Sequence, residues 1–118
     1  MKSHKLLFLF VVTLLLNTNG RYAVADEGLT GLRDIVSLGC HKTGGTCYIQ
    51  INGVPVGAPA CVGNSIRWSV MNNDNGKTWL ALFTTALALK KKVNLNITGC
   101  YVNEPIVPTF SYGTIEGG

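Results

Sequence analysis

Apolar residues recur every three or four positions in one stretch of the chain, and this spacing is typical of an amphipathic helix. The stretch covers residues 79–89, and its apolar positions are Trp79, Leu80, Leu82, Phe83, Ala86, Leu87 and Leu89. Polar residues at 72–75 offer side-chain acceptors for the free N–H groups of a first turn. Three lysines at 90–92 follow, where the helix dipole favours cations. The pattern predicts one helix whose apolar stripe packs on another element.

Alternation of apolar and polar residues predicts strands on both sides of this helix. In one of them, Ile49 and Ile51 point inward and their neighbours point outward. Two segments, 53–63 and 100–108, contain all four prolines of the chain and are predicted to be loops. The predicted strands cover residues 29–38, 47–52 and 65–71 before the helix, and 93–98 and 109–115 after it.

The beginning of the chain has the pattern of a secretory signal peptide. Two lysines precede an apolar run at 6–16, and a small-x-small cleavage motif ends at Ala25. The run has 11 residues, whereas a membrane-spanning helix needs about 20, which disfavours the alternative of an uncleaved anchor. We therefore expect cleavage near Ala25, which leaves a single secreted or periplasmic domain, residues 26–118, with no membrane insertion.

Removal of the predicted signal peptide changes the charge of the protein. The formal net charge falls from +4 to +1, because Lys2, Lys5 and Arg21 lie in the removed segment. So small a charge, on a secreted protein, argues against a nucleic-acid partner. We interpret the lysines at 90–92 as a solvated helix end and not as a phosphate site.

The ionisable residues do not form a catalytic pattern. Nothing in the spacing brings Asp34 and Glu104 together as a carboxylate pair, and both are expected to face solvent. His41 follows Cys40, but in an oxidising compartment we expect the cysteine to be bridged and the histidine to be an exposed turn residue. We therefore predict that the protein is not an enzyme; a small secreted enzyme or enzyme inhibitor is the least favoured alternative.

Four cysteines lie in the domain, and small secreted domains commonly use such residues as disulfides. They are Cys40, Cys47, Cys61 and Cys100. A zinc site is disfavoured because there is no C-x-x-C pair and the domain has a single histidine. We expect two disulfides, no metal and no cofactor.

Three strands, one helix and two strands in a short secreted chain predict a mainly β fold with one helix. The order β-β-β-α-β-β fits an OB-fold, a five-stranded, partly open barrel. An α+β sandwich with the same element order is the alternative.

The barrel also bears on how the cysteines pair. Its first and fourth strands run antiparallel, which places Cys40 far from Cys100. Cys40–Cys47 would close a hairpin loop, and Cys61–Cys100 would join the entry of the third strand to the exit of the fourth. We favour these two bridges, and Cys47–Cys61 in a different connectivity remains open.

A set of short motifs gives the chain a resemblance to a known family. The motifs are Ala60-Cys61, Trp68, Asn75-Gly76-Lys77, the helix ending in lysines, Val93-x-Leu95 and Gly99-Cys100. Over residues 37–114 the chain resembles the secreted OB-fold proteins related to the B subunit of subtilase cytotoxin. The resemblance implies a bacterial protein of the type that forms a homopentameric ring, binds host or cell-surface glycans and carries a separate catalytic A subunit, with a role in virulence. Other members of this family stand alone.

The resemblance and the polar strand faces together suggest ligand contacts. In toxin-type B subunits a serine of the first strand region is central to sialoglycan binding; here Thr30, Ser37 or neither occupies that place. The chain also lacks the cysteine pair that those subunits carry near their C-terminus. Sugars are held by aromatic faces, amides and hydroxyls. The candidate ligand-binding residues are Thr30, Ser37, Tyr48, Gln50, Asn96, Thr98 and Tyr101.

These observations favour a secreted, non-enzymatic, self-associating protein that binds glycans. The alternative is a stand-alone periplasmic or surface OB-fold protein with a structural or interaction role and no sugar ligand.

Overall fold

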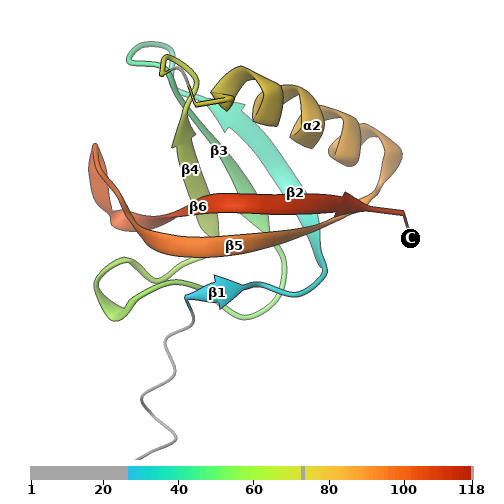
Figure 1. Ribbon diagram of the computed structural model, residues 1–118, viewed down its shortest axis with the longest axis horizontal. Coiled ribbons are helices and arrows are strands. Elements are labelled where there is room, and N and C mark those ends of the chain that lie inside the picture. Colours follow the sequence, from blue (N-terminus) through green and yellow to red (C-terminus); the bar gives the residue numbers. More distant parts are fainter. Residues whose placement is uncertain (1–26, 73, 118) are drawn as a thin grey trace, which may run out of the picture.

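The computed structural model describes residues 27–72 and 74–117, and the predicted signal peptide lies outside these residues. The described chain is mainly β with one α-helix, as predicted (Figure 1). Its elements are β1 (Gly28–Leu29), β2 (Arg33–Cys40), β3 (Thr46–Ile51), the 3-10 helix η2 (Pro59–Cys61), β4 (Ser65–Ser69), α2 (Gly76–Leu89), β5 (Lys92–Tyr101) and β6 (Glu104–Glu116). Within these residues, no helix combines the length and the apolar character needed to cross a membrane.

The strands form one antiparallel sheet in the order β1-β5-β2-β3-β4, with β6 also paired to β5. In Figure 1, β5 and β6 cross in front of β3 and β4, so the sheet curls strongly. The sheet is not closed, because the described residues of β4 and β6 share no backbone ladder. A hydrogen bond from a side chain crosses the seam between β4 and β6: the Thr109 hydroxyl donates to the Arg67 carbonyl at 2.6 Å.

The first predicted strand is in fact two strands, so the sheet has six strands and not five. Residues 29–38 were expected to be continuous, but the chain turns at Gly31, whose φ is 72°. Glycine adopts this left-handed conformation at little steric cost. The turn lets β1 pair with the middle of β5, at Gly28–Ile97, while β2 pairs with the start of β5, at Arg33–Val93.

The predicted loop at 100–108 is wrong. Strand β5 continues to Tyr101 and β6 begins at Glu104, so the two strands form a tight hairpin. Pro105 and Pro108 are tolerated in β6 because, among the described strands, β6 forms a ladder with β5 alone, and proline is accepted in edge strands. The ladder also shifts register on either side of Cys100, which relieves the pairing opposite Pro108. The other predicted loop, 53–63, contains only η2 and a single bridge between Val56 and Gly63.

Two disulfides join Cys40 to Cys47 and Cys61 to Cys100, which are the pairs favoured from the sequence. The first links directly opposed residues of β2 and β3 at their shared hairpin. The second fastens η2 to β5 across a sequence separation of 39 residues. Because a disulfide limits the conformations open to the unfolded chain, a bridge across so long a segment restricts the unfolded state more than the short one does.

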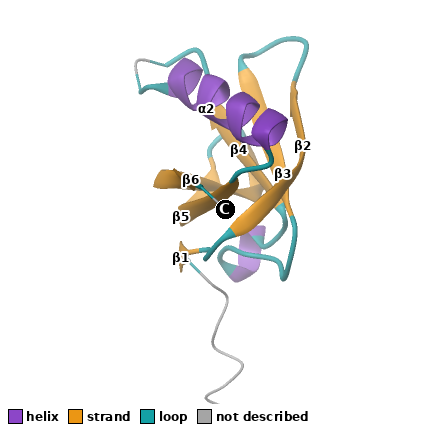
Figure 2. Cartoon of the chain, turned by 90° about the vertical axis from the view of Figure 1, so that its right-hand side faces the viewer, coloured by secondary structure: helices purple, strands orange, loops and turns teal. Residues whose placement is uncertain are grey.

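Helix α2 covers the open face of the curled sheet (Figure 2). Phe83 and Ala86 are fully buried in the core, and Trp79 and Leu80 pack against its edge. The apolar stripe predicted for the helix is wider than the face that packs on the sheet, because Leu82, Leu87 and Leu89 are exposed. The buried residues of the core around the helix are Ile35, Cys47, Ile49, Ile51, Val56, Ile66, Trp68, Val93, Leu95 and Ile97.

The two ends of α2 differ from each other. A side chain from residues 72–75 was expected to cap the start of the helix. This expectation is wrong for the N-cap residue Asn75, because its side chain forms no hydrogen bond to the first turn. The Asn75 backbone is in the left-handed conformation, with a φ of 36°. At the other end Lys90 is also left-handed, and its backbone N–H donates to the carbonyls of Ala86 and Leu87. This arrangement satisfies carbonyls that a helix end leaves free.

We expect the substitution Phe83→Ala to lower the free energy of unfolding by about 3–5 kcal/mol, because it empties the centre of the core. Leu82→Ala is the matched control, since Leu82 is the adjacent residue and is 39% exposed; its cost should stay below about 1.5 kcal/mol. Urea denaturation of residues 26–118 with the disulfides intact measures both. Equal losses for the two variants would contradict the packing of α2.

Candidate functional site

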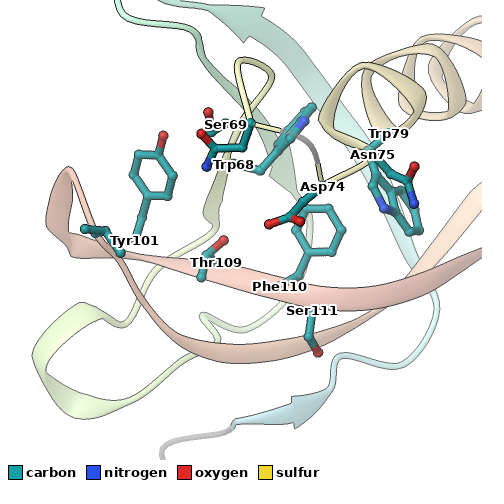
Figure 3. Close-up of a pocket in the computed structure, with 11 residues that line it drawn as sticks. Trp68, Ser69, Asp74, Asn75, Trp79, Tyr101, Thr109, Phe110 and Ser111 are labelled. Carbon is teal, nitrogen blue, oxygen red and sulfur yellow. The ribbon is translucent and has the colours of Figure 1, made fainter.

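A groove of about 520 Å³ lies where β4 ends, α2 begins and β6 passes by (Figure 3). It opens at the seam between β4 and β6, where the sheet is not closed. Its volume falls within the range of about 300–1,000 Å³ found for small-molecule sites. Its walls come from β4, the turn after β4, the first turn of α2, the β5–β6 hairpin and β6.

Aromatic side chains form the base of the groove. Trp68, Trp79 and Phe110 all line it, and they surround the buried ring of Phe83. The rings of Trp79 and Phe110 meet edge to face with centroids 5.0 Å apart. Both are only partly buried, whereas Trp68 is 6% exposed. Trp79 and Phe110 therefore extend the core to the surface and offer apolar area to a ligand.

The start of α2 is held against β4 by a close backbone approach. The Trp68 indole N–H donates to the Gly76 carbonyl at 2.9 Å. A side chain at Gly76 would place its Cβ 2.0 Å from the Ser69 carbonyl oxygen, so only glycine fits this position. The first backbone bond of the helix follows at once, from the Trp79 N–H to the Asn75 carbonyl at 2.9 Å. This contact fixes the groove wall that carries Trp79.

Polar side chains surround the aromatic base. Asp74 and Asn75 are exposed in the turn before α2, and the Asn75 amide takes no part in capping the helix. Thr109 lies across the groove from them, on β6. The polar lining residues are Ser69, Asn72, Asp74, Asn75, Thr109 and Ser111. Amides, hydroxyls and one carboxylate around an apolar floor can bind a ligand that has both hydroxyl groups and C–H faces.

Of the seven residues predicted to contact a ligand, Tyr101 lines the groove. It is buried, and its hydroxyl forms a hydrogen bond with the Thr46 hydroxyl at 2.9 Å. Asn96 and Thr98 do not line the groove: both side chains donate to the hydroxyl of Ser111, at 2.8 and 3.1 Å, on the opposite face of β6. Figure 3 shows Ser111 pointing away from Phe110, toward the other side of β6.

The remaining predicted residues lie elsewhere. Ser37 and Gln50 face each other across the β2–β3 ladder. The Tyr48 ring is covered by the Arg67 guanidinium, 5.2 Å from its centre. Thr30 has a structural contact, since its hydroxyl accepts the Leu95 N–H at 3.1 Å. The structure therefore does not bring the seven predicted residues together in one site.

An ionic cluster lies beyond the groove, where the β2–β3 hairpin approaches β6. Arg67 pairs with Glu104, and His41 Nε2 is 3.4 Å from the same carboxylate. Glu104 is half-buried, so its interpretation as a solvent-facing charge is wrong, whereas His41 is exposed as expected. Asp34 pairs with Lys92 at 2.7 Å, away from Glu104. Within the described part of the chain, no group of three or more His, Cys, Asp or Glu side chains is placed to hold a metal ion.

Comparisons of the chain with protein families, with curated proteins and with solved structures find no match. The comparisons therefore give no indication of what the groove binds.

Sequence reasoning missed most of the groove. The cluster at 72–75 is predicted only to cap the helix, and the aromatic residues Trp79 and Phe110 are not among the predicted ligand contacts. One signal in the sequence could have indicated the groove. Four successive residues with hydrogen-bond acceptors precede the helix, and capping the helix needs only one of these side chains.

We expect Gly76→Ala to destabilise the protein by about 1–3 kcal/mol or more, because the added methyl group meets backbone atoms of β4. The same change should alter the tryptophan fluorescence, since the Trp68 indole bonds to this residue. Gly63→Ala is the control, because a Cβ there has no neighbour within 4 Å and the backbone is not left-handed. Urea titration followed by fluorescence compares them; a Gly76→Ala variant with wild-type stability would refute the close approach.

Proposed function

We propose that this protein is a secreted, non-enzymatic glycan-binding protein and that the groove is its binding site. The observation that carries the proposal is the pairing of two partly exposed rings, Trp79 and Phe110, with the amide and carboxylate groups of the adjacent turn. Sugar rings present C–H faces to aromatic side chains and hydroxyl groups to such polar atoms. The resemblance to toxin B subunits supports the same class of ligand.

The OB-fold is part of this proposal. Strand neighbours β2–β3, β3–β4, β5–β6 and β2–β5 are those of such a barrel, and β4 lies beside β6 where the last pairing would close it. Helix α2 lies between β4 and β5 in the chain and covers the open face, as the plug of such a barrel does. In this description β1 is an addition at the edge of β5.

Secretion is supported by the cysteines and by the predicted signal peptide. Every cysteine of the chain is in a disulfide, and such bonds persist in oxidising compartments. We propose that residues 26–118 are the secreted or periplasmic form.

Self-association into a ring, with five subunits as the resemblance implies, is the second part of the proposal. Large apolar side chains on the surface support it: Leu89 on α2 and Val102 and Ile106 on the β5–β6 hairpin are each more than 60% exposed. Subunit contacts commonly cover such residues. The same residues also support the alternative, a protein that binds other proteins through the hairpin and takes no sugar. A catalytic A subunit remains an implication of the resemblance.

A glycan array probed with residues 26–118 tests the sugar ligand. We expect Asn75→Gly to weaken binding to the glycans found by roughly two- to tenfold, because it removes one hydrogen-bonding amide. Glycine accepts the left-handed backbone of this position, so the fold should be retained. Lys90→Gly is the matched control, since Lys90 is the left-handed residue at the opposite end of α2. An array without binding to any glycan would remove the proposed function.

Size-exclusion chromatography with light scattering tests the ring. We expect a mass several times that of one chain, about five if the ring is that of the toxin relatives. A monomer at micromolar concentration would refute the ring while leaving the glycan site in place.

A further inference from the structure

The groove carries charge of one sign. Among its described lining residues Asp74 is the only acidic one, and none is a lysine, arginine or histidine. Asp74 is exposed, and Figure 3 shows its carboxylate pointing toward the middle of the groove. A ligand that stacks on Trp79 and Phe110 is therefore bound beside a negative charge.

Basic side chains near these elements do not offset this charge. Arg67 on β4 points to the other side of the strand, where it pairs with Glu104 and covers the Tyr48 ring. Lys77 in the first turn of α2 is exposed and is not among the lining residues.

One feature of the groove favours an anion, and it is the weaker one. The first N–H groups of α2 have no intrahelical partners, and the helix dipole places about half a positive charge at this end. Asp74, two residues before the helix, supplies a full negative charge. The partial positive charge of the helix end and the full negative charge of Asp74 add to a net negative charge, which disfavours an anionic ligand in the groove.

We infer that the groove takes neutral or amino sugars and disfavours acidic ones, whether uronates or sialylated glycans. This inference rests on the proposed glycan-binding function and gives it a chemical class. This class of ligand differs from the sialoglycans that the resemblance alone implies.

An array that carries matched neutral, amino and acidic glycans tests the inference, and titration calorimetry with the best neutral glycan and its acidic counterpart gives the ratio of affinities. We expect the acidic form to bind at least about tenfold more weakly. Asp74→Asn should bring the two affinities within about threefold, because the amide keeps the shape of the side chain without its charge.

Glu116→Gln is the control variant. It makes the same change in net charge at the far end of β6, about 16 Å along the strand from Ser111. It should keep the wild-type ratio.

The outcomes separate the two proposals. If no glycan of any class binds, the proposed function fails and the inference fails with it. If glycans bind but acidic ones bind as well as neutral ones, or if Asp74→Asn leaves the ratio unchanged, the inference is overturned and the glycan-binding function stands.

Discussion

The structure depends on the docking of the first turn of α2 against the end of β4. Gly76 has no side chain, so its backbone approaches Ser69 closely, and its carbonyl accepts the Trp68 indole N–H at 2.9 Å. This contact sets the direction of the helix and carries Phe83 into the centre of the core. It also places Trp79 at the surface beside Phe110, so one backbone approach forms both the packing and the groove.

Much of the fold could be predicted because its signals are local. The helical spacing at 79–89 and the alternation in β3 and β4 depend on near neighbours in the chain, and the structure has these elements within a few residues of the predicted bounds. The hairpin of β5 and β6 could not be predicted in this way. Pro105 and Pro108 indicate a loop when they are considered alone, and they are acceptable here because the strand lies at an edge, which depends on distant strands.

The candidate site was less predictable than the fold. Tyr101 was found because an aromatic residue follows a polar strand, but the groove exists because β4 and β6 meet without a ladder. That property belongs to two strands far apart in the sequence. Asn75 has a left-handed backbone imposed by the tight entry into α2, which keeps its amide from capping the helix and leaves it at the rim of the groove.

The disulfide between Cys61 and Cys100 has a topological consequence. These two residues bracket β4, α2 and most of β5. The wall of the groove that β4, Asp74, Asn75 and α2 build therefore lies inside one covalent ring. A protease that cut the chain once beside the exposed Asp74 would leave both fragments tied together, and the fragments would separate only after reduction.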